Sequence, residues 1–252
     1  MEIEESRLKF KFPDKSHVIK FDDTKFYRNL FNSLPESKGI DFIAIENDSI
    51  SFIEVKNCIG DEGNCRWRIA PNNHKRATTS TSIDIGERNS LDIEVPQKVA
   101  MTLAALSGAR SFGENKSSLD ELIEVIKTVF SEDFMYDKKK KYIILFLEGD
   151  FGGHTRTKKM IMSDLQKSMN AKMKWLNCKV SVVDSSTYNK KFFKLYLKIR
   201  CNLFPDKGND FSPLTKHYYI IMDNIKFEWD ENKNRINQKK HGISESYGKF
   251  MD

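Results

Sequence analysis

The sequence predicts an α/β fold in which helices flank a central mixed sheet. Its clearest strand signals are two apolar runs separated by Asn47-Asp48, at residues 40–46 and 50–56. A third run, residues 142–147, is apolar almost throughout, which is typical of a strand covered on both faces. Stretches with helical apolar spacing lie between and after these runs, so strands and helices alternate along most of the chain.

The N-terminal segments precede the two motif strands. Residues 8–12 and 18–21 alternate apolar and basic side chains around Pro13-Asp14, which predicts a small hairpin. Asp22 or Asp23 then stands where a side-chain oxygen caps a helix, because apolar residues follow at helical spacing up to Leu34.

The residues after the second motif strand, about 57–92, form a polar insertion rich in Asn, Ser, Thr and Gly. It begins directly after that strand and carries basic side chains that are candidates for holding phosphates: Arg66, Arg68, Lys75 and Arg76. Trp67 is a candidate for stacking on a base. The alternative is a solvated loop with Trp67 packed against the core.

The second half of the chain continues the alternation. Helices are predicted at residues 94–106, with Pro96 in the first turn, at 118–130 after a capping-box pattern, at 158–176 with a basic face, and at 192–200. Strands are predicted at residues 142–147, 179–184 and 217–222.

The length and composition are those of an ordinary globular protein. The 252 residues are 39% hydrophobic and 31% charged, which suffices for a substantial core. The net charge of +6 permits a polyanionic partner without demanding one. No apolar run is long enough to cross a bilayer, and Met1-Glu2-Ile3-Glu4-Glu5 is unlike a secretion signal, so a cytoplasmic protein with no membrane partner is expected.

The four cysteines do not form a close-set metal pattern. Cys58, Cys65 and His74 offer three zinc ligands from one segment, but no C-x-x-C pair or fourth ligand accompanies them. Reduced thiols are the favoured interpretation.

The two motif strands gather the residues with the most distinctive chemistry. Glu54 and Lys56 are two residues apart on one strand and therefore face the same way, while a short hairpin brings Asp41 beside them. Carboxylate oxygens bind Mg²⁺, and the bound metal lowers the pKa of its water. A lysine beside it is placed to orient or deprotonate that water, or to stabilise charge on a phosphate.

In this arrangement Ile40-Asp41 and Glu54-Val55-Lys56 resemble the PD-(D/E)XK nuclease motif, with Ile40 in place of the proline. The resemblance implies a restriction-endonuclease-like core and an endonuclease that hydrolyses DNA, with RNA not excluded, in genome defence or restriction. It also implies a Mg²⁺ or Mn²⁺ cofactor bound by Asp41, Glu54 and the backbone carbonyl of Val55, with Lys56 assisting the water.

The same resemblance assigns further roles outside the motif strands. Family members often carry a polar or basic residue on the helix after these strands, where Gln97 and Lys98 stand as candidates for substrate contact. The helix before the strands often supplies another acid, and the nearby choices are Asp22, Asp23 and Glu36.

Two other interpretations of the motif remain open. One is a plain hairpin with a charged outer face. The other is a binding or interaction module that retains the nuclease fold without turnover, in which Asp41, Glu54 and Lys56 form a structural ion-pair cluster. A separate interpretation of the whole chain is a structural or toxin-partner protein whose tail mediates association, and a homodimer or another protein partner is among the expectations.

The C-terminal residues 226–244 resemble the opening of a BrnT-type toxin, a RelE-like ribonuclease family, through K-F-E-W-D and K-H-G-I-S. Nineteen residues cannot build a stable domain, so no toxin activity is inferred. The predicted organisation is a nuclease-like domain at 1–224 and a BrnT-like fragment or tail at 225–252.

Overall fold

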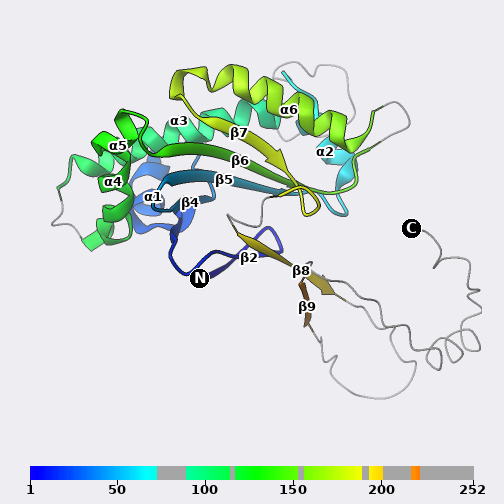
Figure 1. The fold of residues 1–252 in the computed structure, drawn as a ribbon, viewed down its shortest axis with the longest axis horizontal. Coiled ribbons are helices and arrows are strands. Elements are labelled where there is room, and N and C mark those ends of the chain that lie inside the picture. The colour runs from blue at the N-terminus through cyan, green and yellow to red at the C-terminus, as the bar shows by residue number, and fades with distance from the viewer. Residues whose placement is uncertain (73–88, 114–116, 153–155, 189–192, 201–216, 222–252) are drawn as a thin grey trace, which may run out of the picture. The chain divides into compact units, whose positions relative to one another are not determined.

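The computed structural model describes residues 1–72, 89–113, 117–152, 156–188, 193–200 and 217–221 (Figure 1). The chain divides into two compact units, Met1–Ile220 and Ile221–Asp252. Apart from Ile221 the second unit lies outside the described residues, as do the predicted boundary at 224 and the BrnT-like segment. None of the helices among the described residues has the length and apolar character needed to span a membrane.

The secondary structure alternates strands and helices. The strands are β1 Glu2–Glu5, β2 Leu8–Lys11, β3 His17–Lys20, β4 Phe42–Ile45, β5 Ser49–Asn57, β6 Lys140–Glu148, β7 Lys179–Val183, β8 Lys194–Arg200 and β9 His217–Ile221. The α-helices are α1 Lys25–Asn29, α2 Glu62–Ile69, α3 Leu91–Arg110, α4 Ile123–Val129, α5 Glu132–Met135 and α6 Lys158–Lys172. Short 3₁₀ helices are η1 Phe21–Asp23, η2 Phe31–Ser33, η3 Ser117–Leu122 and η4 Lys174–Leu176.

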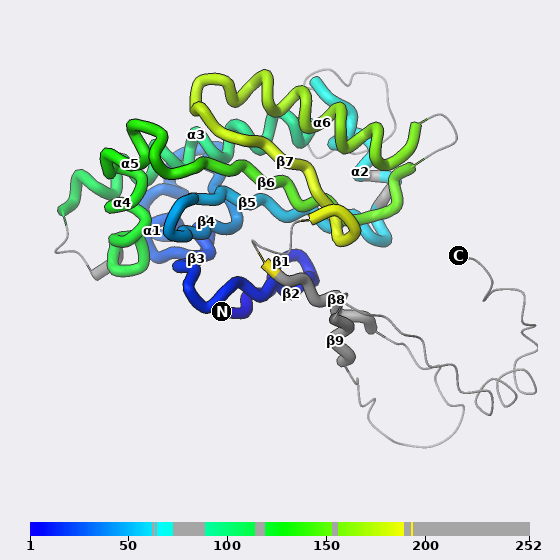
Figure 2. The backbone as a smooth tube through the Cα atoms, in the orientation of Figure 1, coloured from blue at the N-terminus to red at the C-terminus, as the bar shows by residue number. Residues whose placement is uncertain are grey.

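The central sheet is mixed, with strand order β3-β4-β5-β6-β7. The first three strands pair antiparallel, whereas β5, β6 and β7 pair parallel. Parallel neighbours need crossover connections, and these contain α2 to α5 between β5 and β6, and α6 between β6 and β7 (Figures 1 and 2). The prediction of an α/β fold with a mixed sheet flanked by helices is confirmed.

Both faces of this sheet are buried, because strand side chains alternate between two apolar clusters. Ile43, Ile45 and Phe52 belong to the cluster that includes helix residues of α3, α4 and α6. Phe42 and Ile53 belong to a second cluster, which includes residues of β2. The face of β4 and β5 that carries Ile43 and Phe52 is therefore the face that meets the helices.

A smaller sheet, with order β1-β2-β8-β9, contributes Leu8 and Phe10 of β2 to the second cluster. The ring of Phe10 on β2 lies 5.6 Å from that of Phe42 and 5.4 Å from that of Phe146. The predicted hairpin of residues 8–12 with 18–21 is wrong, because β2 pairs with β1 and β8 whereas β3 joins β4 in the central sheet. The two segments belong to different sheets although only a short link separates them.

The predicted helix at 192–200 is also wrong, because β8 occupies this segment and pairs antiparallel with β2. Leu195, Leu197 and Ile199 alternate with other residues, which is the period of a strand. The long-range partner β2 decides between the two interpretations of a short apolar segment.

Two helix starts differ from the sequence predictions. The first helix is capped by Thr24, whose hydroxyl accepts the N–H of Tyr27, and not by Asp22 or Asp23, which lie in η1. The helix predicted at 94–106 begins at Leu91, so Pro96 lies inside it. The earlier start buries Leu91 and adds a turn of helix against the core.

Candidate active site

The hairpin of β4 and β5 places two carboxylates side by side. Its register pairs Phe42 with Ile53, so one further step along each strand brings Asp41 opposite Glu54. Both residues, by strand alternation, face the helix-covered side of the sheet. Both are buried, Glu54 to 0% exposure.

Lys98 of α3 links these carboxylates. Its Nζ donates to Oε1 and Oε2 of Glu54 at 2.7 and 2.8 Å, and to Oδ1 of Asp41 at 3.5 Å. The second oxygen of Asp41, Oδ2, accepts the backbone N–H of Val55 at 2.7 Å. The Asp41 carboxylate is thus fixed between β5 and the ammonium of Lys98.

Lys56 approaches the Glu54 carboxylate from β5 itself. Its Nζ lies 2.6 Å from Oε1 of Glu54 and 3.9 Å from Oε1 of Glu94 on α3. The three residues of the predicted motif, Asp41, Glu54 and Lys56, therefore lie in one group, with two α3 residues added to it.

Arg68 completes the group from α2. Its guanidinium donates to Oε2 of Glu94 at 2.6 Å. The whole set is called the carboxylate–cation cluster below and consists of Asp41, Glu54, Glu94, Lys56, Arg68 and Lys98.

Glu94 was missed at the sequence level, although a signal for it exists. It precedes Lys98 by four residues, and residues four apart share a helix face. The role of Arg68 as the partner of Glu94 had no comparable signal, because it depends on α2, a helix within a segment that was predicted to be a loop.

The other predicted site residues do not join the cluster. Gln97 is exposed and its Oε1 accepts from Asn89, while Arg66 is exposed on α2. Lys75 and Arg76 lie outside the described residues. Val55 contributes the N–H that holds Asp41.

Burial and neighbouring charge shape the electrostatics of the cluster. Burial, followed by the charge of Glu54, raises the pKa of Asp41 to about 7. Burial opposes the charge of Lys98, but Glu54 and Asp41 outweigh it and raise the pKa of that ammonium. Burial likewise opposes the charge of Glu94, yet the cations, Arg68 foremost, lower the pKa of its carboxyl.

Asp22 adds a fourth carboxylate near this group. Its Oδ1 is buried and has no hydrogen-bond partner among the described residues. Burial raises the pKa of this side chain, whereas the charges of Lys20 and Lys98 lower it. The segment is tied to the site because the N–H of Phe21 donates to the carbonyl of Asp41 at 2.9 Å. Among the acids considered from the sequence, Asp22 thus lies within electrostatic reach of Lys98, whereas Asp23 pairs with Lys20 and Arg28.

The raised pKa of Asp41 predicts a pH-dependent difference between the wild type and Asp41→Asn. The unfolded chain ionises this carboxyl near 3.8 and the folded chain only near 7, so wild-type stability falls as pH rises through that window. Asn does not titrate, so the free energy of unfolding of Asp41→Asn relative to that of the wild type should rise by up to about 4 kcal/mol between pH 4 and 8. Urea unfolding across this range measures the difference, and a difference that stays constant with pH would contradict it.

The donors of the cluster suit a hard divalent cation. Carboxylate oxygens are the ligands that Mg²⁺ and Mn²⁺ prefer, and two carboxylates already share one cation, the ammonium of Lys98. Within the described part of the chain, no three or more His, Cys, Asp or Glu side chains gather as a metal-binding group. Asp41 and Glu54 are therefore the residues that would hold such an ion, with the remaining ligands from water or substrate, as is usual for Mg²⁺.

The cysteines considered as zinc ligands differ chemically from these carboxylates. Cys58 and Cys65 are buried and form no disulfide among the described residues, and a hydrogen bond with Cys65, followed by burial, raises the pKa of Cys58. His74, the third ligand considered, lies outside the described residues. A raised pKa disfavours the thiolate, which is the form that binds zinc.

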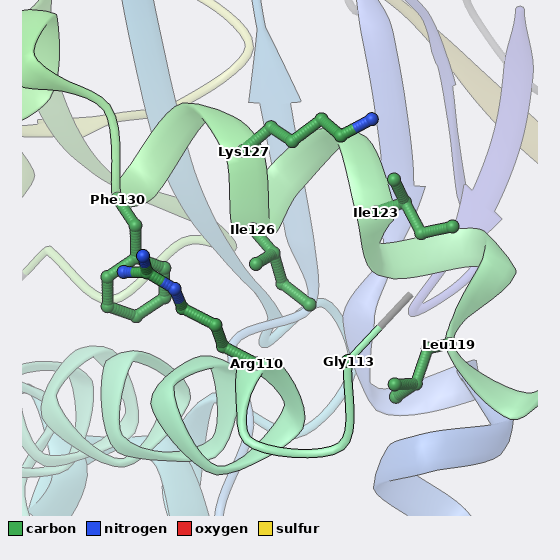
Figure 3. Close-up of a pocket in the computed structure, with 7 residues that line it drawn as sticks. All are labelled: Arg110, Gly113, Leu119, Ile123, Ile126, Lys127 and Phe130. Atoms are coloured by element: carbon green, nitrogen blue, oxygen red, sulfur yellow. The ribbon is translucent and has the colours of Figure 1, made fainter. Parts of the chain in front are cut away.

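A separate cavity of about 320 Å³ lies at the opposite end of α3 (Figure 3). Its lining residues are Arg110, Gly113, Leu119, Ile123, Ile126, Lys127 and Phe130. Arg110 lies about 18 Å along the helix from Lys98, at 1.5 Å of rise per residue. Its guanidinium packs 4.8 Å from the centre of the Phe130 ring. No residue of the carboxylate–cation cluster lines this cavity.

Comparison with known proteins gives one match. A family of unknown function, DUF6661, matches residues 24–197, a span that includes the whole carboxylate–cation cluster. No curated protein and no solved structure matches the chain. Because the match covers well over half of the sequence, the chain belongs to DUF6661, a family of unknown function.

Proposed function

We propose that this protein is a divalent-metal-dependent endonuclease of the PD-(D/E)XK type, which hydrolyses phosphodiester bonds in DNA, with RNA not excluded. The observation that supports it most is the shared cation: Lys98 spans the carboxylates of Asp41 and Glu54, while Lys56 contacts Glu54 from the same strand. Two acids and a lysine on consecutive antiparallel strands, followed by a parallel strand, also fit a restriction-endonuclease-like core.

In this proposal each residue has a separate task. Asp41 and Glu54 bind Mg²⁺ or Mn²⁺, which would lower the pKa of a bound water and neutralise charge at the phosphate. Lys56 contacts Glu54, and its role is to orient or deprotonate the attacking water, or to stabilise charge on the phosphate. Glu94 and Arg68 position Lys56 through the contact between Glu94 and its Nζ.

The biological setting follows from the same resemblance. The resemblance to PD-(D/E)XK nucleases suggests the restriction of mobile elements, so a cytoplasmic role in genome defence or restriction is the proposed context. The partner is then a nucleic acid, with which the net charge of +6 is compatible.

The test is cleavage of supercoiled plasmid, linear duplex, single-stranded DNA and RNA by the purified full chain with Mg²⁺, Mn²⁺ or EDTA. We expect cutting with metal, none with EDTA, and a rate at least about 10²-fold lower for Lys56→Met. Lys127→Met, a change of the same kind in the separate cavity, serves as the matched control and should cut at the wild-type rate. A Lys56→Met variant that cuts as fast as the control would remove the proposed role of Lys56.

One observation favours a second candidate, a non-catalytic nucleic-acid-binding or interaction module that retains the fold. Lys56, Lys98 and Arg68 are each paired with a carboxylate of the chain itself, as in a structural ion-pair cluster. Under this alternative, DNA binding falls steeply with salt, is unchanged by EDTA, and leaves the DNA intact. The cleavage experiment separates the two candidates directly.

A further inference from the structure

Lys98 holds a position in the site that differs from that of Lys56, although both contact Glu54. Lys98 reaches both oxygens of Glu54 and also Oδ1 of Asp41, whereas Lys56 contacts the carboxylates of Glu54 and Glu94. Lys98 therefore neutralises both carboxylates that would bind a metal ion, whereas Lys56 contacts one of them.

The helix that carries Lys98 is fixed to the segment just before β4, which carries Asp41. Thr102, one turn further along α3, is fully buried and its Oγ1 accepts the backbone N–H of Ile40 at 3.1 Å. The Lys98 side chain itself is only 12% exposed. Its ammonium is therefore held at the two carboxylates by the packing of α3 and not by a loose surface contact.

The opposite side of the Asp41 carboxylate is also committed. Oδ2 accepts the N–H of Val55, so Oδ1 is the oxygen that faces Lys98. A cation that binds between Asp41 and Glu54 must use the oxygens that Lys98 contacts. Oε1 of Glu54 already contacts the ammonium groups of both Lys98 and Lys56, so a divalent cation at these oxygens would add further positive charge at a buried site and be repelled.

We propose that Lys98 is an internal counter-cation that competes with the divalent metal for Asp41 and Glu54 and so limits metal loading of the site. The inference rests on the proposed function, because it assumes that these carboxylates are the metal ligands. By linkage, any ligand that draws Lys98 away, such as a substrate phosphate, raises metal affinity. The site would then load its metal most readily when nucleic acid is present.

The experiment measures metal binding and not cleavage. Mn²⁺ is titrated into the full-length wild type, Lys98→Met and Lys56→Met by calorimetry, and free Mn²⁺ is followed in parallel by electron paramagnetic resonance. Both variants remove one ammonium from Glu54, so any general effect of charge is common to them. We expect Lys98→Met to bind Mn²⁺ at least about 10-fold more tightly than the wild type. The increase in Mn²⁺ affinity of Lys56→Met over the wild type should be at least about threefold smaller than that of Lys98→Met.

The remaining outcomes are decisive as well. An equal gain in both variants, or a loss in Lys98→Met, would overturn the competition. Lys98→Gln, which keeps a polar side chain beside Glu54, is measured in the same way and replaces Lys98→Met if circular dichroism shows that the latter is unfolded. Metal-dependent cleavage by the wild type without tighter Mn²⁺ binding by the Lys98 variants defeats this inference alone, whereas no Mn²⁺ binding by any of the proteins defeats the proposed function with it.

Discussion

Glu54→Gln is expected to lower metal-dependent cleavage by at least about 10²-fold. Changes to residues that merely support a metal ligand already cost 10- to 100-fold in affinity or activity, so loss of a ligand charge should cost at least the upper end of that range. Gln keeps the shape of the side chain but removes the charge that would bind the metal. The measurement is the initial rate of plasmid cleavage at saturating Mg²⁺.

The same variant should also unfold more easily. Glu54 is fully buried and pairs with the ammonium groups of Lys56 and Lys98. Gln removes this charge and leaves the two lysines with their longer contacts to Glu94 and Asp41. We expect a loss of about 1–3 kcal/mol in the free energy of unfolding, measured in urea. Glu124→Gln, the same change at an exposed position of α4, is the control and should alter neither quantity. Wild-type cleavage by Glu54→Gln would exclude Glu54 as a metal ligand.

Asp92→Ala is expected to destabilise the fold by about 3–5 kcal/mol, because it removes a buried carboxylate together with the hydrogen bonds that it accepts, one of them from the partly exposed ammonium of Lys172. Asp92 is fully buried at the start of α3. Its carboxylate accepts from Lys172 at 2.8 Å and from Ser168 at 2.7 Å, both on α6, and from Ser90 at 2.6 Å. The helix that carries Lys98 and Glu94 is thus tied to α6 by one side chain.

The pH dependence of this contribution has a defined sign. Burial opposes the charge of Asp92, but the hydrogen bonds from Lys172, Ser90 and Ser168 lower its pKa below the usual 3.8. The stabilisation is therefore present above about pH 4 and lost as pH falls further. Urea unfolding of Asp92→Ala at pH 7 and pH 3 should show a smaller difference from the wild type at the lower pH. Gln97→Ala, exposed on the same helix, should stay within about 0.5 kcal/mol of the wild type, and a similarly small effect of Asp92→Ala at pH 7 would contradict the assignment.

Part of the candidate site follows from local sequence. The runs that become β4 and β5 are apolar and joined by a short turn, so their pairing and the common face of Glu54 and Lys56 need no distant partner. Their register then brings Asp41 opposite Glu54. Lys98 was a candidate through the resemblance alone, as one of two neighbouring residues on a helix.

The choice between Gln97 and Lys98 depends on how α3 is rotated against the sheet. That rotation is set by buried residues such as Val95 and Val99 and by the bond from Ile40 to Thr102. A helix pattern with apolar residues around much of its first turns does not reveal this rotation by itself.

The sequence by itself determined the α/β alternation, the motif hairpin and the strand at β6, because periods of 2 and 3.6 and short turns are local properties of the chain. Only the tertiary structure decided that β2 and β3 enter different sheets, that residues 194–200 form a strand, that Lys98 meets the motif carboxylates, and that Glu94, paired with Arg68, lies beside Lys56. Each of these depends on pairing or burial between segments far apart in sequence. In such cases the partner segment, and not the local pattern, decides which conformation has the lowest free energy.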